Sequence, residues 1–473
     1  MVQIAELIAY QARIDPERTA IVAGDKVVTY GMLERAVRGI VARLQGVKLA
    51  PGSIVAVSIE AQSRHMAVSL ALARMGLVSA PFKSRAGLDA LPNPALVLSD
   101  RTMLLADGRL STEVTDDWYG GSPGDGALPR LVLADDAAAR IILSSGTTGS
   151  PKTIVHSNRT VAAHAAGVEF IFDSVGGVRR LQSLMGLTSA WAYFAALAAL
   201  KRGVAVLFAR GAEQTLRMIA TYGCDYVSGS ANQMRELVEE QRRQYVAVPS
   251  LRAAGTGGSL VPQELVREMQ ATLSPRVLLF YGSSEAGLSG LEVVNAQGWQ
   301  DGSGGYVTPW TELEVVDDAH RPLPRGADGE IRLRTPGLAA AATEAAADGG
   351  LPWFYPGDRG TLQADGRIVI SGRTTDMINI GGSKLSCEVI EQYLLRHPMV
   401  LDAGVIGITA ASGFQAIRAA VVSAQPLDEA EFRAFVKGQR ASAVPAEIVR
   451  VEAIPRGDGG KIRREALREL LQG

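Results

Sequence analysis

The chain has 473 residues, 47% of them hydrophobic and 21% charged, a composition that excludes a disordered chain and predicts more than one folded domain. Its 48 basic and 49 acidic residues leave a net charge of −1, so no bulk positive field is present to attract nucleic acid or an anionic membrane. No apolar run reaches the roughly 18 residues that a membrane span requires. The N-terminus lacks the basic start and apolar run of a signal peptide. Two cysteines are too few for a disulfide scaffold, so we expect a cytoplasmic protein.

Helical and strand-like segments alternate along the first 290 residues or so. Apolar residues at helical spacing are followed by short runs of β-branched residues, which is typical of parallel strands joined by helices. The segments that show this alternation are 36–46, 53–60, 65–82, 94–100, 200–210, 224–243 and 265–287. We therefore expect an α/β fold with a large N-terminal domain of stacked, parallel-rich sheets and helices.

The pattern changes from about Asp301, where short alternating strands and turn residues predict an antiparallel, β-rich subdomain. The Ala-rich stretch 338–352 is typical of a short helix with a loop. The last hundred residues alternate helix and strand over a length that suits a small, mobile α+β domain. The polar stretch 372–376 is the expected hinge, so we expect domains at 1–371 and 377–473.

Residues 144–152 read SSGTTGSPK, a stretch that cannot fill a core. Its glycines let backbone amides approach an anion, its hydroxyls add donors, and Lys152 adds a positive charge. The spacing is not that of a Walker loop. Strand-like runs lie on both sides, at 139–144 and 152–157, which predicts a strand-loop-strand phosphate lid. A flexible linker is the alternative, but it would not need Pro151 and Lys152 at its end.

This stretch resembles the phosphate loop of the AMP-forming adenylating enzymes, which include the acyl- and aryl-CoA synthetases, the adenylation domains of peptide synthetases and the luciferases. Four further stretches match that family in the same order along the chain. They are YGSSEAG at 281–287, YPGDRG at 355–360, GRTTDMINIGGSKLS at 372–386 and IPRGDGGKIRREAL at 454–467. The resemblance covers essentially the whole chain and is closest to a compact acyl- or aryl-CoA synthetase.

The resemblance implies activation of a carboxylic acid with ATP and Mg²⁺, followed by acyl transfer to the pantetheine thiol of coenzyme A. The implied catalytic residues are Lys461, Lys152, Thr148 and Glu285, with Mg²⁺ held by Glu285 and Thr148. The implied nucleotide-binding residues are Ser144, Ser145, Gly146, Thr147, Gly149, Gly257, Gly258, Tyr281, Gly282, Ser283, Ser284, Asp358 and Arg373. Gly381 and Gly382 would line the thiol channel, although a Gly-Gly pair is also typical of a plain hairpin turn.

The residue types suit this chemistry. A carboxylate such as Glu285 supplies the oxygen ligand that Mg²⁺ prefers, and the carboxylate of Asp358 can accept two ribose hydroxyls. Lys461 follows Gly459 and Gly460, so it can reach into a cleft and bridge the acid and the phosphate. The alternatives are an ordinary surface acid, a turn aspartate and a solvated surface lysine.

The acid site is expected at Ser189, Trp191, Tyr193, Ser228, Gly229 and Ser230. The small side chains of the last three would leave room for a sizeable acyl group. Aromatic residues on a helix, such as Trp191 and Tyr193, are more often core residues than ligand contacts. A His that often gates this site in the family is replaced by the stretch around Thr188 and Ser189.

Three hypotheses remain. The first is a CoA ligase whose C-terminal domain rotates about the hinge, bringing Lys461 to the adenylate in one orientation only. The second is an enzyme that loads the phosphopantetheine of an acyl carrier protein. The third is a non-catalytic adenylate-binding protein, suggested by departures from the family pattern at Thr153, Thr375 and Val389. The oligomeric state does not follow from the sequence.

Overall fold

The computed structural model describes residues 4–105, 108, 111–120, 133–144, 152–294, 299, 302–339, 351–380, 383–409, 415–457 and 460–472. The expected phosphate loop from 145 to 151, most of the Ala-rich stretch and Gly381–Gly382 therefore lie outside the described residues.

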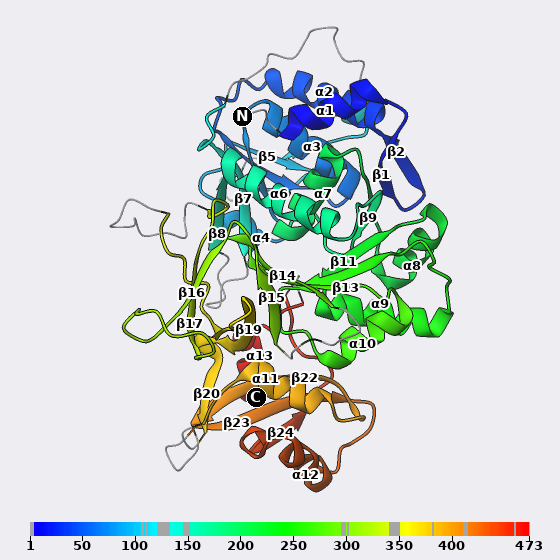
Figure 1. Cartoon of the computed structure of the whole chain (residues 1–473). Helices are drawn as coiled ribbons and strands as arrows, with labels where there is room; N and C mark the ends of the chain where they lie inside the picture. The colour runs from blue at the N-terminus through cyan, green and yellow to red at the C-terminus, as the bar shows by residue number, and fades with distance from the viewer. Residues whose placement is uncertain are drawn as a thin grey trace.

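A six-stranded sheet forms the first layer of the large N-terminal part (Figure 1). Its strands, in spatial order, are β6 (Thr112–Glu113), β5 (Leu96–Ser99), β3 (Ile54–Ser58), β4 (Val78–Pro81), β7 (Ala138–Ser144) and β8 (Lys152–Ser157). All neighbours are parallel except β7 and β8, which form an antiparallel pair. The parallel-rich character that the sequence predicted is confirmed for this sheet.

A thirteen-stranded sheet forms the second layer. Its strands, in spatial order, are β16 (Glu312–Val316), β17 (Gly329–Arg334), β18 (Asp358–Leu362), β19 (Arg367–Arg373), β15 (Ser303–Val307), β14 (Gly287–Val294), β13 (Val277–Ser283), β12 (Ala253–Gly257), β11 (Tyr226–Ser230), β9 (Arg180–Ser183), β10 (Ala205–Phe208), β1 (Thr19–Ala23) and β2 (Lys26–Thr29). Strands β1 and β9–β13 pair in parallel, whereas the pairs on the β14 side are antiparallel.

The β-rich region from about Asp301 is antiparallel, as the sequence predicted. It continues the large sheet, because β13 and β14 pair along their whole length as a hairpin and carry the ladder from parallel to antiparallel strands. The tip of this hairpin carries the predicted YGSSEAG motif, so the motif lies where the two kinds of strand meet.

Helices fill the space between the sheets and cover their outer faces. They are α1 (Ile4–Ile14), α2 (Tyr30–Gln45), α3 (Gln62–Arg74), α4 (Arg85–Asp89), α5 (Asp117–Gly120), α6 (Asn158–Ser174), α7 (Ala190–Lys201), α8 (Gly211–Tyr222), α9 (Ala231–Gln244) and α10 (Gln263–Thr272). Every residue from Ala192 to Leu200 in α7 is buried, as expected for a helix packed on all sides. One continuous core joins α2, α3, α6 and α7 to strands of both sheets, and a second joins α8, α9 and α10 to the large sheet.

The C-terminal part begins beyond the short 3₁₀ turn Thr374–Asp376 and lies below the β13 and β15 end of the large sheet in Figure 1. It contains β20 (Met377–Ile380), β21 (Ser383–Ser386), α11 (Cys387–Leu395), β22 (Val400–Thr409), β23 (Gln415–Ser423), α12 (Glu429–Gln439), β24 (Glu447–Arg450) and α13 (Arg464–Gln472). Strands β22, β23 and β24 form a small sheet with its own core on each face, so the expected α+β character is confirmed.

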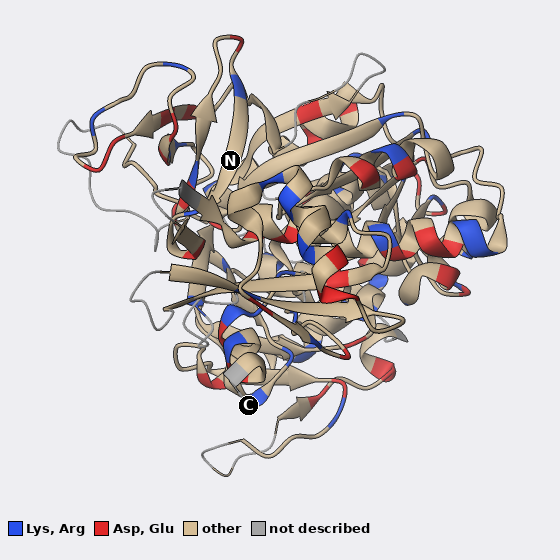
Figure 2. Cartoon of the chain, turned by 90° about the horizontal axis from the view of Figure 1, so that it is seen from below, with Lys and Arg blue, Asp and Glu red and all other residues tan. Residues whose placement is uncertain are grey.

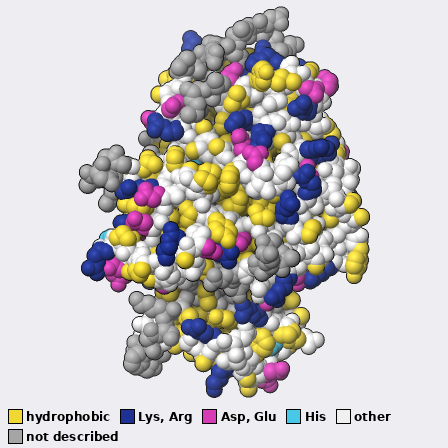
Figure 3. Space-filling view, in the orientation of Figure 1, with side chains coloured by type: hydrophobic (Ala, Val, Ile, Leu, Met, Phe, Trp, Pro, Cys, Tyr) yellow, Lys and Arg dark blue, Asp and Glu magenta, His cyan; other side chains and the backbone are white. Residues whose placement is uncertain are grey.

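Basic and acidic residues are interspersed along the ribbon in Figure 2, and their side chains are interspersed over the face shown in Figure 3, in line with the net charge of −1. Among the residues that the structure describes, no helix is long and apolar enough to span a bilayer.

Candidate active site

The predicted phosphate loop connects two strands that pair directly. Ser144, the last residue of β7, lies opposite Lys152, the first residue of β8, so the strand-loop-strand arrangement that the sequence predicted is confirmed on both flanks. Lys152 is exposed at the base of the loop. The loop itself, with Ser145, Gly146, Thr147, Thr148 and Gly149, lies outside the described residues, as does the side chain of Ser144.

The β13–β14 hairpin presents Glu285 at its tip, where its side chain is half-buried. Ser283 Oγ accepts a hydrogen bond of 3.1 Å from the Ala286 backbone amide, which closes the turn. A Cβ at Gly282 would lie 2.2 Å from the Gly287 carbonyl oxygen, so only glycine fits at that position. Ser284 precedes Glu285 at the same tip. The turn thus holds a carboxylate and two hydroxyls together, as a magnesium and nucleotide site needs.

His164 packs against this turn. It was not among the site residues predicted from the sequence. Its Nε2 donates to the Gly337 carbonyl oxygen at 2.9 Å, and its ring would lie 3.2 Å from a Cβ at Gly287. The Ala339 amide donates to the Glu285 carbonyl oxygen at 2.9 Å. Burial lowers the pKa of His164 to about 4, so the ring is neutral near pH 7. A histidine on a buried helix face carries no sequence signal for this role.

Asp358 joins two other predicted residues. The Tyr281 hydroxyl donates to Asp358 Oδ2 at 3.0 Å, and Arg373 Nε lies 2.9 Å from Asp358 Oδ1. Asp358 and Arg373 also face each other across the β18–β19 pair. Burial, and next the Asp358 charge, hold the pKa of Tyr281 well above its usual range, so the phenol stays protonated and keeps donating. Asp358 is therefore held by two partners and is not an ordinary turn aspartate.

Lys461 lies among the charged residues of both the N-terminal and the C-terminal parts. Its side chain keeps solvent exposure although protein atoms crowd around it. Burial lowers the pKa of Lys461, the Arg373 charge lowers it further, and the carboxylates of Glu388, Asp358 and Glu285 oppose this. The structure thus gathers Lys461, Glu285, Asp358 and Arg373 from four separate motifs into one electrostatic cluster.

The loop that carries Lys461 contacts the large sheet directly. A Cβ at Gly460 would lie 3.1 Å from Ser230 Oγ and 3.2 Å from the Asn232 Cβ. Ser230 is the last residue of β11 and caps α9, whose Gln233 amide donates to its Oγ at 3.4 Å. The C-terminal loop is therefore seated on one of the residues predicted for the acid site.

Glu388 is a second residue that the sequence analysis did not assign. It lies in the first turn of α11, and burial raises the pKa of its carboxyl while Arg464 and then Lys461 lower it. The family pattern places an acid at the position of Val389, and this chain has Glu388 one residue earlier. That one-residue offset is the signal from which Glu388 could have been found.

Of the residues predicted for the acid site, Trp191 and Ser228 contact each other, whereas Tyr193 lies in the core. Trp191 Nε1 donates to Ser228 Oγ at 3.1 Å, and the indole stacks on Phe280 with ring centroids 4.7 Å apart. Ser189 caps α7 through a hydrogen bond from the Ala192 amide. Tyr193 points elsewhere, because it is buried with the Arg140 guanidinium 3.6 Å over its ring. Tyr193 is a core residue, which is the alternative that its helical position favoured.

Gly229 does not supply the expected room for a large acyl group, because on β11 it faces away from Ser228 and Ser230. A Cβ there would lie 2.8 Å from Leu184 Cδ1, so the space left by the missing side chain is occupied by leucine. Gly257 is small for a similar reason, since a Cβ would lie 2.5 Å from the Phe280 carbonyl oxygen. Gly258 differs, with φ at +85° and nothing within 4 Å of a Cβ, so it can present bare backbone to a ligand.

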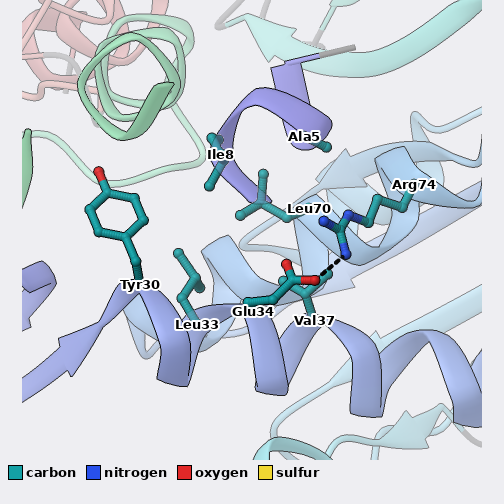
Figure 4. A pocket seen from close by; sticks show the side chains of 8 residues that line it. All are labelled: Ala5, Ile8, Tyr30, Leu33, Glu34, Val37, Leu70 and Arg74. Carbon is teal, nitrogen blue, oxygen red and sulfur yellow. Dashed lines mark hydrogen bonds and ion pairs between the residues drawn. The ribbon is translucent and has the colours of Figure 1, made fainter. Parts of the chain in front are cut away.

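A small pocket among α1, α2 and α3 is not a second candidate site. Figure 4 shows that apolar side chains line it around the Glu34–Arg74 ion pair, whose atoms lie 2.9 Å apart. Its volume of about 10 Å³ admits a single water molecule at most.

The family models match the two parts of the chain separately. The model described as AMP-binding enzyme matches residues 8–341, and the model described as AMP-binding enzyme C-terminal domain matches residues 389–461. The chain belongs to the AMP-binding enzyme family. The resemblance drawn from the sequence motifs is thereby confirmed, and the site described above is that of a member of this family.

Curated relatives of this AMP-binding enzyme include ligases with two kinds of thiol acceptor. The fatty acid–[acyl-carrier-protein] ligase ScoC of Streptomyces coeruleorubidus is 26% identical over 99% of this chain and 96% of its own length. The indoleacetate–CoA ligase of Aromatoleum aromaticum is 26% identical over 99% of this chain and 98% of its own length.

Solved structures show the same fold. ATP-bound MatB from Rhodopseudomonas palustris superimposes with a TM-score of 0.83 at 22% identity, covering 99% of both chains. The O-succinylbenzoate coenzyme A synthetase MenE from Bacillus subtilis, in complex with AMP, superimposes with a TM-score of 0.83 at 20% identity, covering 98% of both chains. The α/β fold class with a smaller C-terminal domain is thereby confirmed.

Proposed function

We propose that this AMP-binding enzyme activates a carboxylic acid with MgATP and transfers the acyl group to the pantetheine thiol of coenzyme A. In the first step a carboxylate oxygen bonds to the α-phosphorus of ATP, the bond from that phosphorus to the bridging oxygen breaks, and pyrophosphate leaves. In the second step the thiolate sulfur bonds to the acyl carbon, the bond to AMP breaks, and the thiol proton passes to solvent.

The observation that carries this proposal is that Lys461 lies within electrostatic range of Glu285 and of the Asp358–Arg373 ion pair. Two anions, the acid and the α-phosphate, must approach each other in the first step, and Lys461 and Arg373 supply the positive charge that makes this approach favourable. Asp358, oriented by Tyr281 and Arg373, keeps acceptor lone pairs for the ribose hydroxyls. Gly258 and Lys152 would contact the nucleotide, together with the phosphate loop.

The described residues fit a magnesium ion that is bound mainly by the nucleotide. None of the described His, Cys, Asp and Glu side chains form a group of three or more that could hold a metal, whereas Glu285 stands half-exposed at the hairpin tip. Mg²⁺ usually takes one or two protein carboxylates and completes its shell with phosphates and water. Glu285, with Thr148 in the phosphate loop, would hold it, and the ion would neutralise charge on the phosphates.

We further propose that residues 372–376 are the hinge between domains 1–371 and 377–473. A Cβ at Gly372 would lie 2.0 Å from the Ser386 Cβ, so the start of α11 rests directly on glycine backbone. The Thr374 amide donates to the Gly357 carbonyl oxygen at 2.8 Å, while Thr375 is exposed. The orientation with Lys461 near Asp358 suits adenylation, and rotation at Thr375 would withdraw Lys461 and admit the thiol past Gly381 and Gly382.

A carrier-protein thiol is the second candidate acceptor, supported by the similarity to ScoC. Similarity to the CoA ligases supports free coenzyme A. A non-catalytic, adenylate-binding role would not require Lys461 to be gathered with Glu285 and Asp358.

The proposal is tested by ATP–pyrophosphate exchange over a panel of short-chain, medium-chain, aromatic and amino acids. The reactions are then repeated with free coenzyme A, and with an acyl carrier protein in its phosphopantetheine form, and the products are weighed by mass spectrometry. Exchange with one acid and a matching CoA thioester is the expected result. Exchange with a thioester on the carrier protein alone would change the acceptor, and no exchange with any acid would overturn the enzymatic function.

A further inference from the structure

One face of the large sheet limits how far an acyl group can extend. Side chains alternate along a strand, so Tyr226, Ser228 and Ser230 of β11 lie on the same face. Phe280 of β13 lies on this face as well, because its ring would meet a Cβ at Gly255 in the neighbouring β12 at 2.4 Å. Helix α7 crosses this face and contributes Trp191.

The layer at Ser228 is filled. The Trp191 indole donates to Ser228 Oγ and stacks on Phe280, with an interplanar angle of 25°. The phenyl ring of Phe280 in turn takes the space above Gly255. Trp191 and Phe280 are both partly exposed and pack against the edge of the interior core.

The layer at Ser230 is covered by the C-terminal loop that carries Lys461. Gly460, next to Lys461, lies against Ser230 Oγ and Asn232. An acid whose carboxylate is near Lys461 therefore starts at the Ser230 layer and meets the Trp191–Phe280 pair one strand step further on. A two-residue step along a strand is about 6.5 Å, which accommodates roughly four carbons of an extended chain.

We propose that the acid substrate is a short aliphatic acid of about two to four carbons and that Trp191 sets this limit. The inference rests on the proposed function and on the placement of the acid beside Ser230. It reverses the expectation of a sizeable acyl group, because Trp191 and Phe280 cover Ser228 and Gly255 on the face that the acid would use.

The structure also indicates what lies beyond the limit. The Tyr226 hydroxyl is buried at the Ser228 layer itself, because a Cβ at Gly255, the residue paired with Ser228, would lie 2.4 Å from it. Shortening Trp191 would open the Ser228 layer and expose this hydroxyl as a donor. A Trp191→Ala variant should therefore accept longer or aromatic acids, and best of all those with an acceptor atom at the far end.

The test measures binding and exchange separately. Non-reactive 5′-O-(N-acylsulfamoyl)adenosines with acetyl, butanoyl, octanoyl and benzoyl groups are titrated calorimetrically into the wild-type protein, Trp191→Ala and Trp191→Phe. We expect the wild type to bind the acetyl or butanoyl compound at least about 10-fold more tightly than the octanoyl and benzoyl compounds. Trp191→Ala should remove or invert this ratio, and Trp191→Phe should change it less.

Trp310→Ala is the matched control. Trp310 is also partly buried, donates from Nε1 to a protein acceptor at 3.2 Å and contacts a phenylalanine ring at 5.2 Å, but its contacts are with Leu288 and Phe170. It should leave the ratio between short and long compounds as in the wild type. The same change of ratio in Trp310→Ala would overturn the assignment to Trp191.

The outcomes separate this inference from the proposed function. If the wild type binds the octanoyl or benzoyl compound as tightly as the acetyl compound, and exchanges pyrophosphate with the corresponding acid, the size limit is wrong and the enzymatic function stands. If no compound binds and no acid supports exchange, both are overturned.

Discussion

Two crowded cations, Arg140 in β7 and Lys461 before α13, have opposite surroundings. Arg140 is 1% exposed and is surrounded by neutral groups, with hydrogen bonds to Ser79 Oγ at 3.1 Å and to the Leu187 carbonyl oxygen at 2.6 Å, and with the Tyr193 ring 3.6 Å away. Lys461 keeps solvent exposure, and three carboxylates and Arg373 influence its pKa.

The difference separates a structural charge from a reactive one. Burial lowers the pKa of Arg140 to about 10, so the guanidinium is still charged at neutral pH, but Nη1 and Nη2 already donate to neutral acceptors, an aromatic ring lies over the group, and its Nε, unpaired within the described part of the chain, is buried away from solvent. Lys461 has carboxylates around it at a distance and no direct ion pair among the described residues, so it can engage an incoming anion. A cation is available for chemistry when its hydrogen-bond donors are free of partners and also open to solvent.

Removal of the Lys461 ammonium should have the largest effect. We expect Lys461→Ala to lower the adenylation rate by at least about 1000-fold, since the charge that offsets the developing negative charge is lost. Thioester formation from pre-made acyl-adenylate should be spared, because the proposed rotation withdraws Lys461 from that step. The two half-reactions are measured separately by pyrophosphate exchange and by thioester release.

An equal loss in both half-reactions would contradict the two-orientation account. Lys437→Ala, a lysine of the same domain near the end of α12, is the control and should affect neither half-reaction.

Replacing the aromatic face of Arg140 tests the structural side of the comparison. Tyr193→Leu should lower the free energy of unfolding by about 2–3 kcal/mol, because a desolvated cation–π contact of roughly 2 kcal/mol is lost together with some buried packing. Tyr193→Phe keeps the ring and should lose less. Chemical denaturation measures both variants.

The folded fraction of Tyr193→Leu should keep the wild-type ranking of acids. A changed ranking of acids at unchanged stability would indicate that Tyr193 contacts the acid, and would contradict its placement beside Arg140.

Loss of the His164 hydrogen bond tests how the turn that carries Glu285 is held. His164→Phe should raise the KM for MgATP about 5-fold, because a net hydrogen-bond contribution of about 1 kcal/mol to the turn disappears. His164→Asn keeps a donor toward the Gly337 carbonyl oxygen and should recover part of the effect. Titration of MgATP at saturating acid gives KM and kcat separately.

A fall in kcat with unchanged KM would contradict a role in positioning Glu285. A drop in thermal stability alone, with both constants unchanged, would reduce His164 to a packing role.

The smallest expected effect is a shift in the pH dependence of pyrophosphate exchange, which depends on the protonation of Lys461. The Glu388 carboxylate raises the pKa of Lys461, so Glu388→Gln should lower that pKa, and the protonated form should be lost at a lower pH. The alkaline fall in pyrophosphate exchange should then begin at a lower pH than in the wild type, with little change near neutrality. Glu452→Gln, an exposed acid of the same domain, should leave the profile in place. An unchanged profile in Glu388→Gln would show that Glu388 does not act on Lys461.

Most of the candidate site residues could be predicted from the sequence. The residues that hold them in place could not. The strands on both sides of the phosphate loop, and the gathering of Glu285, Asp358, Arg373 and Lys461, followed from motif order. His164 and Glu388 were missed because the first is a helix residue whose partners are far along the chain, and the second lies one position from the family pattern.

The sequence by itself determined the fold class and the family and supplied the candidate site residues, because local periodicity and short motifs depend on neighbours within a few positions. Only the tertiary structure decided how much space surrounds those residues. Gly229 is small in the sequence, but Leu184 occupies the space beside it, and Trp191 could be a core or a site residue until Ser228 and Phe280 were placed against it. A sequence shows which side chain is absent at a position, whereas packing between distant segments determines what fills the gap.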